Sequence, residues 1–115
     1  DGRKWPWGNE FDANKCNTTG DRTEFVKAHP NGRSPYGCYD MSGNVWQWTE
    51  SYRDDGHTRF VMIRGGSYFD AKGSDWYVKG GPMACNSHTK FILMYPGLDR
   101  CATIGFRCVV DVKTE

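Results

Sequence analysis

The stretch Gly43-Asn44-Val45-Trp46-Gln47-Trp48-Thr49-Glu50-Ser51, GNVWQWTES in one-letter code, carries the strongest signal for the fold. It opens with a Gly-Asn pair, which is typical of a turn, and then alternates polar or aliphatic residues with two tryptophans. A period of two residues predicts a β-strand with two different faces. Burial of an indole ring is favourable enough to explain both tryptophans without a ligand, so a core strand is the simpler interpretation of the aromatic face.

Further strands are predicted on the C-terminal side of this segment. Residues 59–68, RFVMIRGGSY, alternate in the same way and end at Gly65-Gly66, after the polar turn 53–58. Residues 103–112, TIGFRCVVDV, predict a final strand. Residues 86–94 are the best candidate for a helix, although a weak one, and the apolar run 91–94 within them also suits a buried turn or a short strand. Residues 1–35 are rich in turn signals such as Pro6 and the Asn31-Gly32 pair.

Composition limits the class of protein. A chain of 115 residues fits a single domain with a modest core, and an aromatic content of 15% with 14 glycines favours a loop-rich fold. The net charge of +1 with no stripe of Lys and Arg argues against nucleic acid as a partner. No apolar run approaches about 18 residues, so no membrane span is expected. The chain starts at Asp1 without an initiator methionine or a signal-peptide pattern, and we expect a further segment upstream.

The five cysteines are Cys16, Cys38, Cys85, Cys101 and Cys108. Their spacing matches neither a Cys-x-x-Cys pair nor a zinc site. One or two structural disulfides, or buried thiols, are the favoured interpretation, and a reactive thiol is the alternative. Because the number is odd, at least one cysteine must stay unpaired or pair outside this chain.

Five blocks of sequence, taken in order, resemble the signature blocks of the formylglycine-generating enzyme (sulfatase-modifying factor) family. They are Trp5 to Asp12 (WPWGNEFD), Ala13-Asn14, Tyr36 to Trp48 (YGCYDMSGNVWQW), Ile63 to Tyr68 (IRGGSY) and Ile104 to Cys108 (IGFRC). The resemblance implies an α+β fold: the irregular, loop-rich C-type lectin-like fold with short antiparallel strands. It implies that residues 1–115 form a single domain lacking the family's N-terminal part, with Trp46 and Trp48 packed in the core.

The resemblance also implies which chemistry to look for. Oxidase members of the family carry two reactive cysteines shortly after the Gly-Gly-Ser block, because only thiolates bind the soft cuprous ion. Those two positions are Asp70 and Asp75 here, and a carboxylate is a hard ligand. A related branch uses histidine-bound iron for sulfoxide synthesis, but His29, His57 and His88 are scattered through the sequence. We therefore expect no copper or iron and no oxidase activity, with a metal-dependent oxidase whose remaining residues lie outside this chain as the alternative.

Calcium is the one cofactor that the resemblance suggests, at two sets of oxygen ligands. The first set is Asn14, the carbonyl of Lys15, Asp21 and, as a further member, Thr23. The second set is Asp40, the carbonyls of Gly43 and Val45, and the side chain of Gln47. Gln47 stands in place of a family glutamate, which removes one charge, while Asp40 in place of a family asparagine restores one. The alternative is that these polar residues cap turns.

Residues 69–100 read as a long irregular loop between two strands, and loops on rigid scaffolds are where binding usually occurs. The expected ligand-binding residues combine rings with adaptable polar groups: Phe69, Asp70, Asp75, Trp76, Tyr77, Asn86, His88 and Tyr95.

The expected function is a non-catalytic module that binds a protein ligand or companion chain. The alternatives are the variable receptor protein of a diversity-generating retroelement, which has the same layout, and a structural subunit of an extracellular assembly. We expect an extracellular, periplasmic, or cell or virion surface location.

Overall fold

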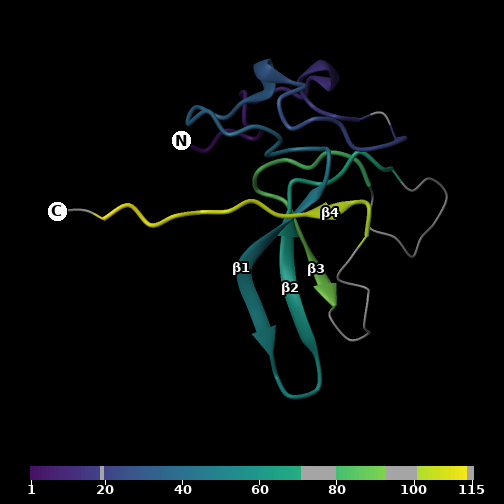
Figure 1. Cartoon of the computed structure of the whole chain (residues 1–115), viewed down its shortest axis with the longest axis vertical. Helices are drawn as coiled ribbons and strands as arrows, with labels where there is room; N and C mark the ends of the chain where they lie inside the picture. The colour runs from purple at the N-terminus through teal and green to yellow at the C-terminus, as the bar shows by residue number, and fades with distance from the viewer. Residues whose placement is uncertain (19, 71–79, 93–100, 114–115) are drawn as a thin grey trace.

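The computed structural model describes residues 1–18, 20–70, 80–92 and 101–113 (Figure 1). The elements are two single-turn 3-10 helices, η1 (Ala13–Lys15) and η2 (Pro30–Gly32), and four strands: β1 (Trp46–Asp54), β2 (Arg59–Arg64), β3 (His88–Ile92) and β4 (Ile104–Gly105). The predicted loop-rich architecture with short strands is confirmed. The α component is not found, because the described ranges contain no α-helix. Nor does any helix of these ranges have the length and apolar character needed to cross a membrane.

The four strands form one mixed sheet in the order β3-β2-β1-β4. β1 and β2 pair as an antiparallel hairpin that projects away from the N-terminal loops, with Trp48 opposite Ile63 and Asp54 opposite Arg59 (Figure 1). An irregularity in the register between Trp48 and Tyr52 divides β1 into two parts. β2 and β3 are also antiparallel, whereas β1 and β4 are parallel. The expectation of antiparallel strands is therefore correct for three of the four strands.

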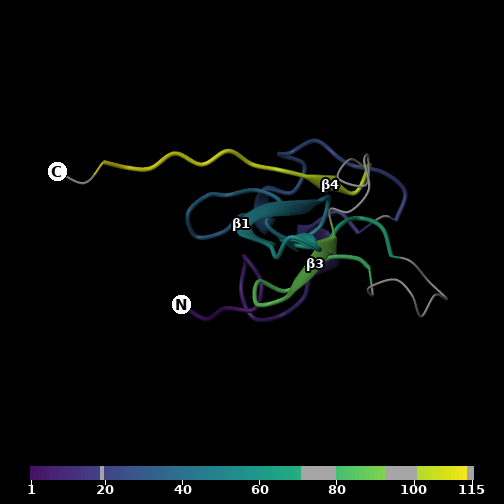
Figure 2. The ribbon, with the colours of Figure 1, turned by 90° about the horizontal axis from the view of Figure 1, so that it is seen from below.

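Two segments differ from the sequence-based expectations. Residues 88–92, within the candidate helix 86–94, form β3, because each of them pairs with a residue of β2, from His88 with Arg64 to Ile92 with Phe60. Tertiary pairing decides the conformation of this short apolar run. The predicted final strand 103–112 is reduced to Ile104 and Gly105, and the chain then leaves the sheet as an extended segment (Figures 1 and 2). Phe106 and Val110 of that segment are 75% and 87% exposed.

Besides Pro6, the buried apolar side chains of the described residues are few: Cys16, Val61, Ile63 and Tyr68. Val61 and Ile63 are two apart in β2 and so share one face of the sheet, as the alternation predicted. Trp46 and Trp48 are only half-buried, so the expectation that both rings are core residues holds in part. Buried polar residues are as numerous, namely Asn17, Ser42, Asn44 and Ser67, and hydrogen bonds therefore contribute much of the order in this region.

Candidate functional site

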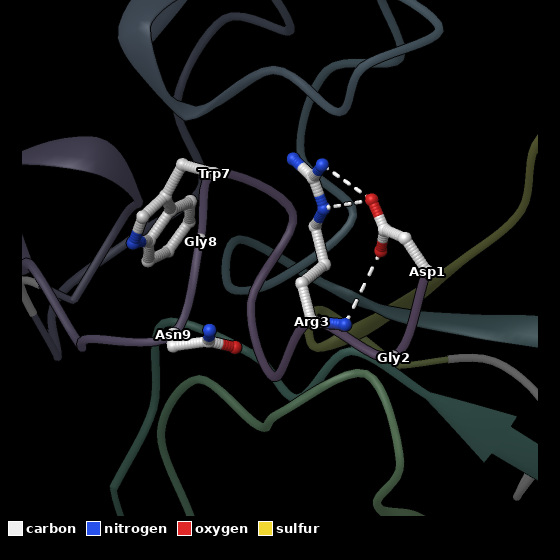
Figure 3. A pocket seen from close by; sticks show the side chains of 6 residues that line it. All are labelled: Asp1, Gly2, Arg3, Trp7, Gly8 and Asn9. Carbon is white, nitrogen blue, oxygen red and sulfur yellow. Dashed lines mark hydrogen bonds and ion pairs between the residues drawn. The ribbon is translucent and has the colours of Figure 1, made fainter.

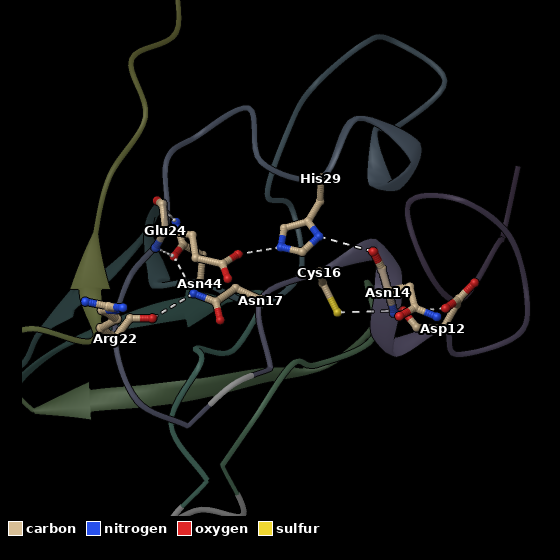
Figure 4. Close-up of polar contacts among 8 residues, drawn as sticks. All are labelled: Asp12, Asn14, Cys16, Asn17, Arg22, Glu24, His29 and Asn44. Atoms are coloured by element: carbon tan, nitrogen blue, oxygen red, sulfur yellow. Dashed lines mark hydrogen bonds and ion pairs between the residues drawn. The ribbon is translucent and has the colours of Figure 1, made fainter.

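A network of polar side chains fixes the turn that precedes β1 (Figure 4). Asn44 has a positive φ of 67°, a conformation that asparagine tolerates better than most residues. Its side-chain oxygen accepts hydrogen bonds from Nδ2 of Asn17 at 3.0 Å and from the backbone N–H of Glu24 at 2.9 Å. Asn17 also donates to the carbonyl of Arg22 at 2.9 Å. The 17–24 loop is thereby held against the start of β1.

His29 connects the same loop to the N-terminal turn (Figure 4). Its Nε2 lies 2.5 Å from a carboxylate oxygen of Glu24, and its Nδ1 lies 3.1 Å from the carbonyl oxygen of Asn14. Burial by itself would lower the pKa of His29, but the hydrogen bonds to Glu24 and Asn14 and the charges of Glu24 and Asp40 together raise this pKa above its ordinary value. Folding therefore shifts the proton equilibrium of His29 toward the imidazolium form, relative to an ordinary histidine.

The second predicted calcium set centres on Asp40 and Gln47, and the structure brings these two residues together. The amide nitrogen of Gln47 donates to the backbone carbonyl of Asp40 at 2.5 Å. The amide oxygen of Gln47 accepts from Nε of Arg107, also at 2.5 Å, and Nη2 of Arg107 donates to the carbonyl of Tyr39 at 2.7 Å. The oxygen that was expected to bind calcium is therefore engaged by a side-chain cation.

In contrast to the amide oxygen of Gln47, one oxygen of the Asp40 carboxylate is not bonded to any described residue. Its Oδ2 is inaccessible to solvent and has no hydrogen-bond partner among the described residues, so a buried polar atom is left unsatisfied there. Burial raises the pKa of Asp40, Glu24 adds to this effect, and His29 and Arg107 oppose it. Asp40, Gly43 and Asn44 all have a positive φ, of 54°, 83° and 67°, and Val45 follows directly in the sequence. Asp40 thus fits a bound cation, and Gln47, in the orientation that it adopts, does not.

The first predicted calcium set is less well assembled. The carbonyl oxygen of Lys15 packs so closely on Gly32 that a Cβ there would lie 1.8 Å from it. Asn14, Asp21 and Thr23 are exposed, and the Asn14 backbone carbonyl already accepts a hydrogen bond from His29. The described contacts of Asn14 and Lys15 are thus to backbone and side-chain groups of this region, and calcium binding by this set stays a prediction.

The predicted binding loop is anchored firmly at its base. Gly81 donates to the carbonyl of Phe69 at 2.8 Å, Ser67 donates to the carbonyl of Gly81 at 3.3 Å, and Gly66 and Pro82 form an isolated bridge. Tyr68, which is buried, donates to the carbonyl of Asn44 at 3.0 Å. The two ends of the 70–80 segment are therefore joined, and they rest on the turn that precedes β1.

The loop over 69–100 is not continuous, because β3 divides it. Phe69, Asp70, Asn86 and His88 are exposed, and His88 lies in a strand, opposite Arg64, rather than in a loop. The remaining predicted ligand-binding residues, Asp75, Trp76, Tyr77 and Tyr95, fall outside the described residues.

All five cysteines lie in the described ranges, and all five are free thiols, so the structure does not contain the predicted disulfides. Burial, with smaller contributions from Asp12 and Asp40, raises the pKa of Cys16 to about 11. Burial also raises the pKa of Cys85. Cys85 is held next to Lys4 and Arg64 through its backbone, whereas Cys101 lies 3.3 Å from the hydroxyl of Thr103. Reactive thiols need a lowered pKa, and these two shifts have the opposite sign.

The three histidines lie in three different segments of the chain. His29 precedes η2, His57 lies in the turn between β1 and β2, and His88 begins β3. Within the part of the chain that the structure describes, no three side chains of His, Cys, Asp or Glu come together as a metal site. A calcium site built mainly from backbone and amide oxygens is a different arrangement, and this observation does not test it.

A pocket beside the N-terminal turn has a volume of about 430 Å³ and is lined by Asp1, Gly2, Arg3, Trp7, Gly8 and Asn9 (Figure 3). Its arginine is neutralised by Asp1, which accepts from Nε of Arg3 at 2.7 Å and from its backbone N–H at 3.2 Å. The Trp7 ring stacks on Trp5 with 5.6 Å between ring centroids. The charged and aromatic groups of this pocket therefore already have partners.

Together these features define a loop-rich domain in which a small mixed sheet supports an anchored loop and a turn with an unsatisfied carboxylate. A family model described as a sulfatase-modifying factor enzyme 1-like domain matches residues 1–112, and the chain belongs to this FGE-sulfatase family. The resemblance drawn from the five sequence blocks is therefore confirmed.

The named relatives include proteins of different activities. The inactive C-alpha-formylglycine-generating enzyme 2 of Bos taurus is 37% identical over 82 residues, which cover 60% of this chain and 27% of that protein. The formylglycine-generating enzyme of Bos taurus is 31% identical over 119 residues, covering 91% and 29%. The serine/threonine-protein kinase pkn1 of Chlamydia caviae is 39% identical over 119 residues, covering 96% and 18%. The chain thus spans about a quarter of the length of the first two.

Sequence reasoning missed two contacts of the candidate site. Arg107 was recognised only as part of a signature block, although a single arginine within the alternating apolar residues 103–112 is a signal for a specific polar contact. The bond between His29 and Glu24 carried no such signal, because both residues lie in irregular segments. Such pairs depend on how loops fold back on each other.

Proposed function

We propose that this chain is a non-catalytic member of the sulfatase-modifying factor family, which binds a protein ligand through the loop that begins at Phe69. The observation that carries the proposal is the rigid base of this loop. Hydrogen bonds between Phe69, Ser67 and Gly81 close it, and Tyr68 ties it to the turn before β1. A loop fixed at both ends presents side chains with a smaller loss of conformational entropy on binding.

Two further observations support a non-catalytic role. Asp70 stands where oxidase members of the family carry the first reactive cysteine, and Asp75 stands at the place of the second. The raised pKa values of Cys16 and Cys85 keep these thiols protonated, which opposes copper binding and nucleophilic chemistry. The similarity to a protein named as inactive agrees with this, whereas the similarity to the formylglycine-generating enzyme of Bos taurus keeps the oxidase alternative open to test.

The experiment compares partner capture with turnover. Phe69→Ala removes an exposed ring next to the loop base, and Phe25→Ala, at another exposed ring, is the matched control. We expect the Phe69 variant to retain its fold and to lose most of the captured partner, while the control captures as much as the parent chain. Stoichiometric copper or iron, together with turnover of a cysteine-containing peptide, would overturn the non-catalytic assignment.

We also propose calcium as a structural cofactor at the turn of Asp40, Gly43 and Val45. The support is the buried, unpartnered Oδ2 of Asp40 and the affinity of calcium for carboxylate and carbonyl oxygens. Calcium should raise the midpoint of thermal unfolding of the parent chain relative to a chelator. Asp40→Asn retains the size and the tolerance of positive φ but removes the charge, and should abolish most of this rise. An equal rise in both proteins would exclude Asp40 as a ligand.

A further inference from the structure

The segment that follows β4 leaves the domain as an extended arm, residues 106–112 (Figures 1 and 2). Within the described part of the chain, strand pairing ends at Gly105, which pairs with Gln47 of β1. No backbone–backbone hydrogen bond among the described residues involves the arm. The described residues therefore leave the N–H and C=O groups along both edges of the arm open, and an open edge is a template for an added strand.

The side chains of the arm have the composition and the pattern of a strand. Phenylalanine and valine are enriched in strands. The alternation of the arm sets one face, which consists of Phe106, Cys108, Val110 and Val112. All four are exposed, and Val109 on the opposite face is 79% exposed. The arm thus combines open edges with an uncovered apolar face, a combination that favours association with another chain.

The charges of the arm are arranged symmetrically about its central residue. Arg107 lies two positions before Val109, and Asp111 lies two positions after it. When two arms run antiparallel with Val109 opposite Val109, Arg107 of each copy lies opposite Asp111 of the other. Parallel in-register pairing would instead place like charges opposite each other, which is destabilising. The arm is therefore complementary to a second copy of itself in the antiparallel register centred on Val109.

Both charged side chains are able to enter such pairs. Arg107 uses Nε and Nη2 in its bonds to Gln47 and Tyr39, and its Nη1 group makes no bond to a described residue. The carboxylate of Asp111 likewise has no ion pair or hydrogen bond among the described residues. Because the contacts with Gln47 and Tyr39 orient the guanidinium, less conformational entropy is lost when a carboxylate binds to Nη1.

We propose that two copies of this chain associate through their arms, which form an antiparallel two-stranded ribbon with a twofold axis at Val109. In this register Phe106 lies opposite Val112 of the second copy. Cys108 lies opposite Val110, and cross-strand pairs of aromatic and β-branched residues are favourable. Because both copies use the same surface, the assembly closes as a dimer. A two-stranded ribbon is only marginally stable by itself, so the dissociation constant should be roughly 0.1 mM.

Sedimentation equilibrium of the full chain under reducing conditions, from about 5 μM to about 1 mM, tests the association. Asp111→Lys replaces the two attractive pairs of the dimer by two repulsive ones and should raise the dissociation constant about tenfold or more. Glu10→Lys makes the same change of charge at an exposed residue outside the arm, and Phe69→Ala alters the proposed loop site. Both controls should leave the association unchanged. A monomer throughout the concentration range, or equal weakening by either control, would overturn the proposal.

The register is tested by disulfide formation between two copies. The background chain carries serine at the other exposed cysteines, Cys85, Cys101 and Cys108. Val109→Cys then places two thiols opposite each other at the twofold axis, at a Cα separation that a disulfide spans. Val112→Cys is the matched control in the same arm, because its two thiols lie roughly 20 Å apart in this register. We expect mild oxidation to link the Val109 variant much faster, and equal rates or a faster Val112 variant would overturn the proposal.

Discussion

Arg107 in the C-terminal segment donates from its Nε to the amide oxygen of Gln47 in β1 across 2.5 Å, although 60 positions separate the two residues. A second bond from the same guanidinium, 2.7 Å long, reaches the carbonyl of Tyr39. β4 ends at Gly105, so this side chain extends the attachment of the C-terminal segment beyond the last strand pair. One residue thus joins the end of the chain to both the strand and the turn before it.

Arg107→Gln should therefore destabilise the chain by about 1 kcal/mol, less than the roughly 1.5–3 kcal/mol of hydrogen bonds to charged groups, because the side chain is exposed. Urea unfolding measures the change. Lys113→Gln makes the same change of charge in the same segment without a described contact and should alter the free energy of unfolding by a few tenths of a kcal/mol at most. Equal effects of the two substitutions would show that charge, and not the contact with Gln47, matters.

The pair of His29 and Glu24 should make stability depend on pH. The folded-state pKa of His29 is raised, so the folded chain binds the proton more tightly than the unfolded chain. The stabilisation is fully present below the unfolded value of about 6.5 and is lost as the pH rises through the raised folded value. Glu24→Gln should remove most of this dependence. Unfolding by urea at a series of pH values across this window measures it, and an unchanged slope in the variant would rule out Glu24 as the cause.

Two glycines at the loop base should respond very differently to alanine. Both have positive φ, 71° at Gly66 and 83° at Gly81, so alanine at either position meets a conformational cost of about 1–2 kcal/mol. Of the two, only Gly66 would place a Cβ against the backbone, 2.1 Å from the carbonyl oxygen of Gly81, while no described atom lies within 4 Å of a Cβ at Gly81. Gly66→Ala should thus cost substantially more stability than Gly81→Ala and should also reduce partner capture. Similar losses in both variants would contradict the proposed loop base.

Thiol reactivity should separate Cys16 from the exposed cysteines. Cys16 is 2% exposed and burial raises its pKa to about 11, so its thiolate is scarce at neutral pH and inaccessible to reagents. In the native chain, Cys101 and Cys108 should react rapidly with a disulfide reagent, and Cys16 only after unfolding. Cys16→Ser should leave the fast phase unchanged and remove one slow equivalent. A fast phase that loses one equivalent in this variant would show that Cys16 is accessible.

The sequence predicted the central hairpin and the turns around it because those signals are local. The alternation of residues 45–49 and 59–64 determines which residues share a face of β1 and of β2. Val61 and Ile63 share a face and are both buried, as expected. The Trp5 to Gly8 turn forms through two backbone hydrogen bonds of 2.8 and 3.1 Å, as the Pro-containing sequence indicated. The family signature also came from the sequence alone, because its blocks are short and ordered.

Tertiary structure decided what local patterns leave open. Residues 88–92 became a strand because β2 offers them a pairing edge, and residues 106–113 left the sheet although their alternation is that of a strand. The orientation of Gln47 toward Arg107, and the isolation of the Asp40 carboxylate, arise from contacts between segments far apart in the chain. Periodicity determines which residues share a face, but hydrogen-bond partners and burial depend on which distant segment packs against that face.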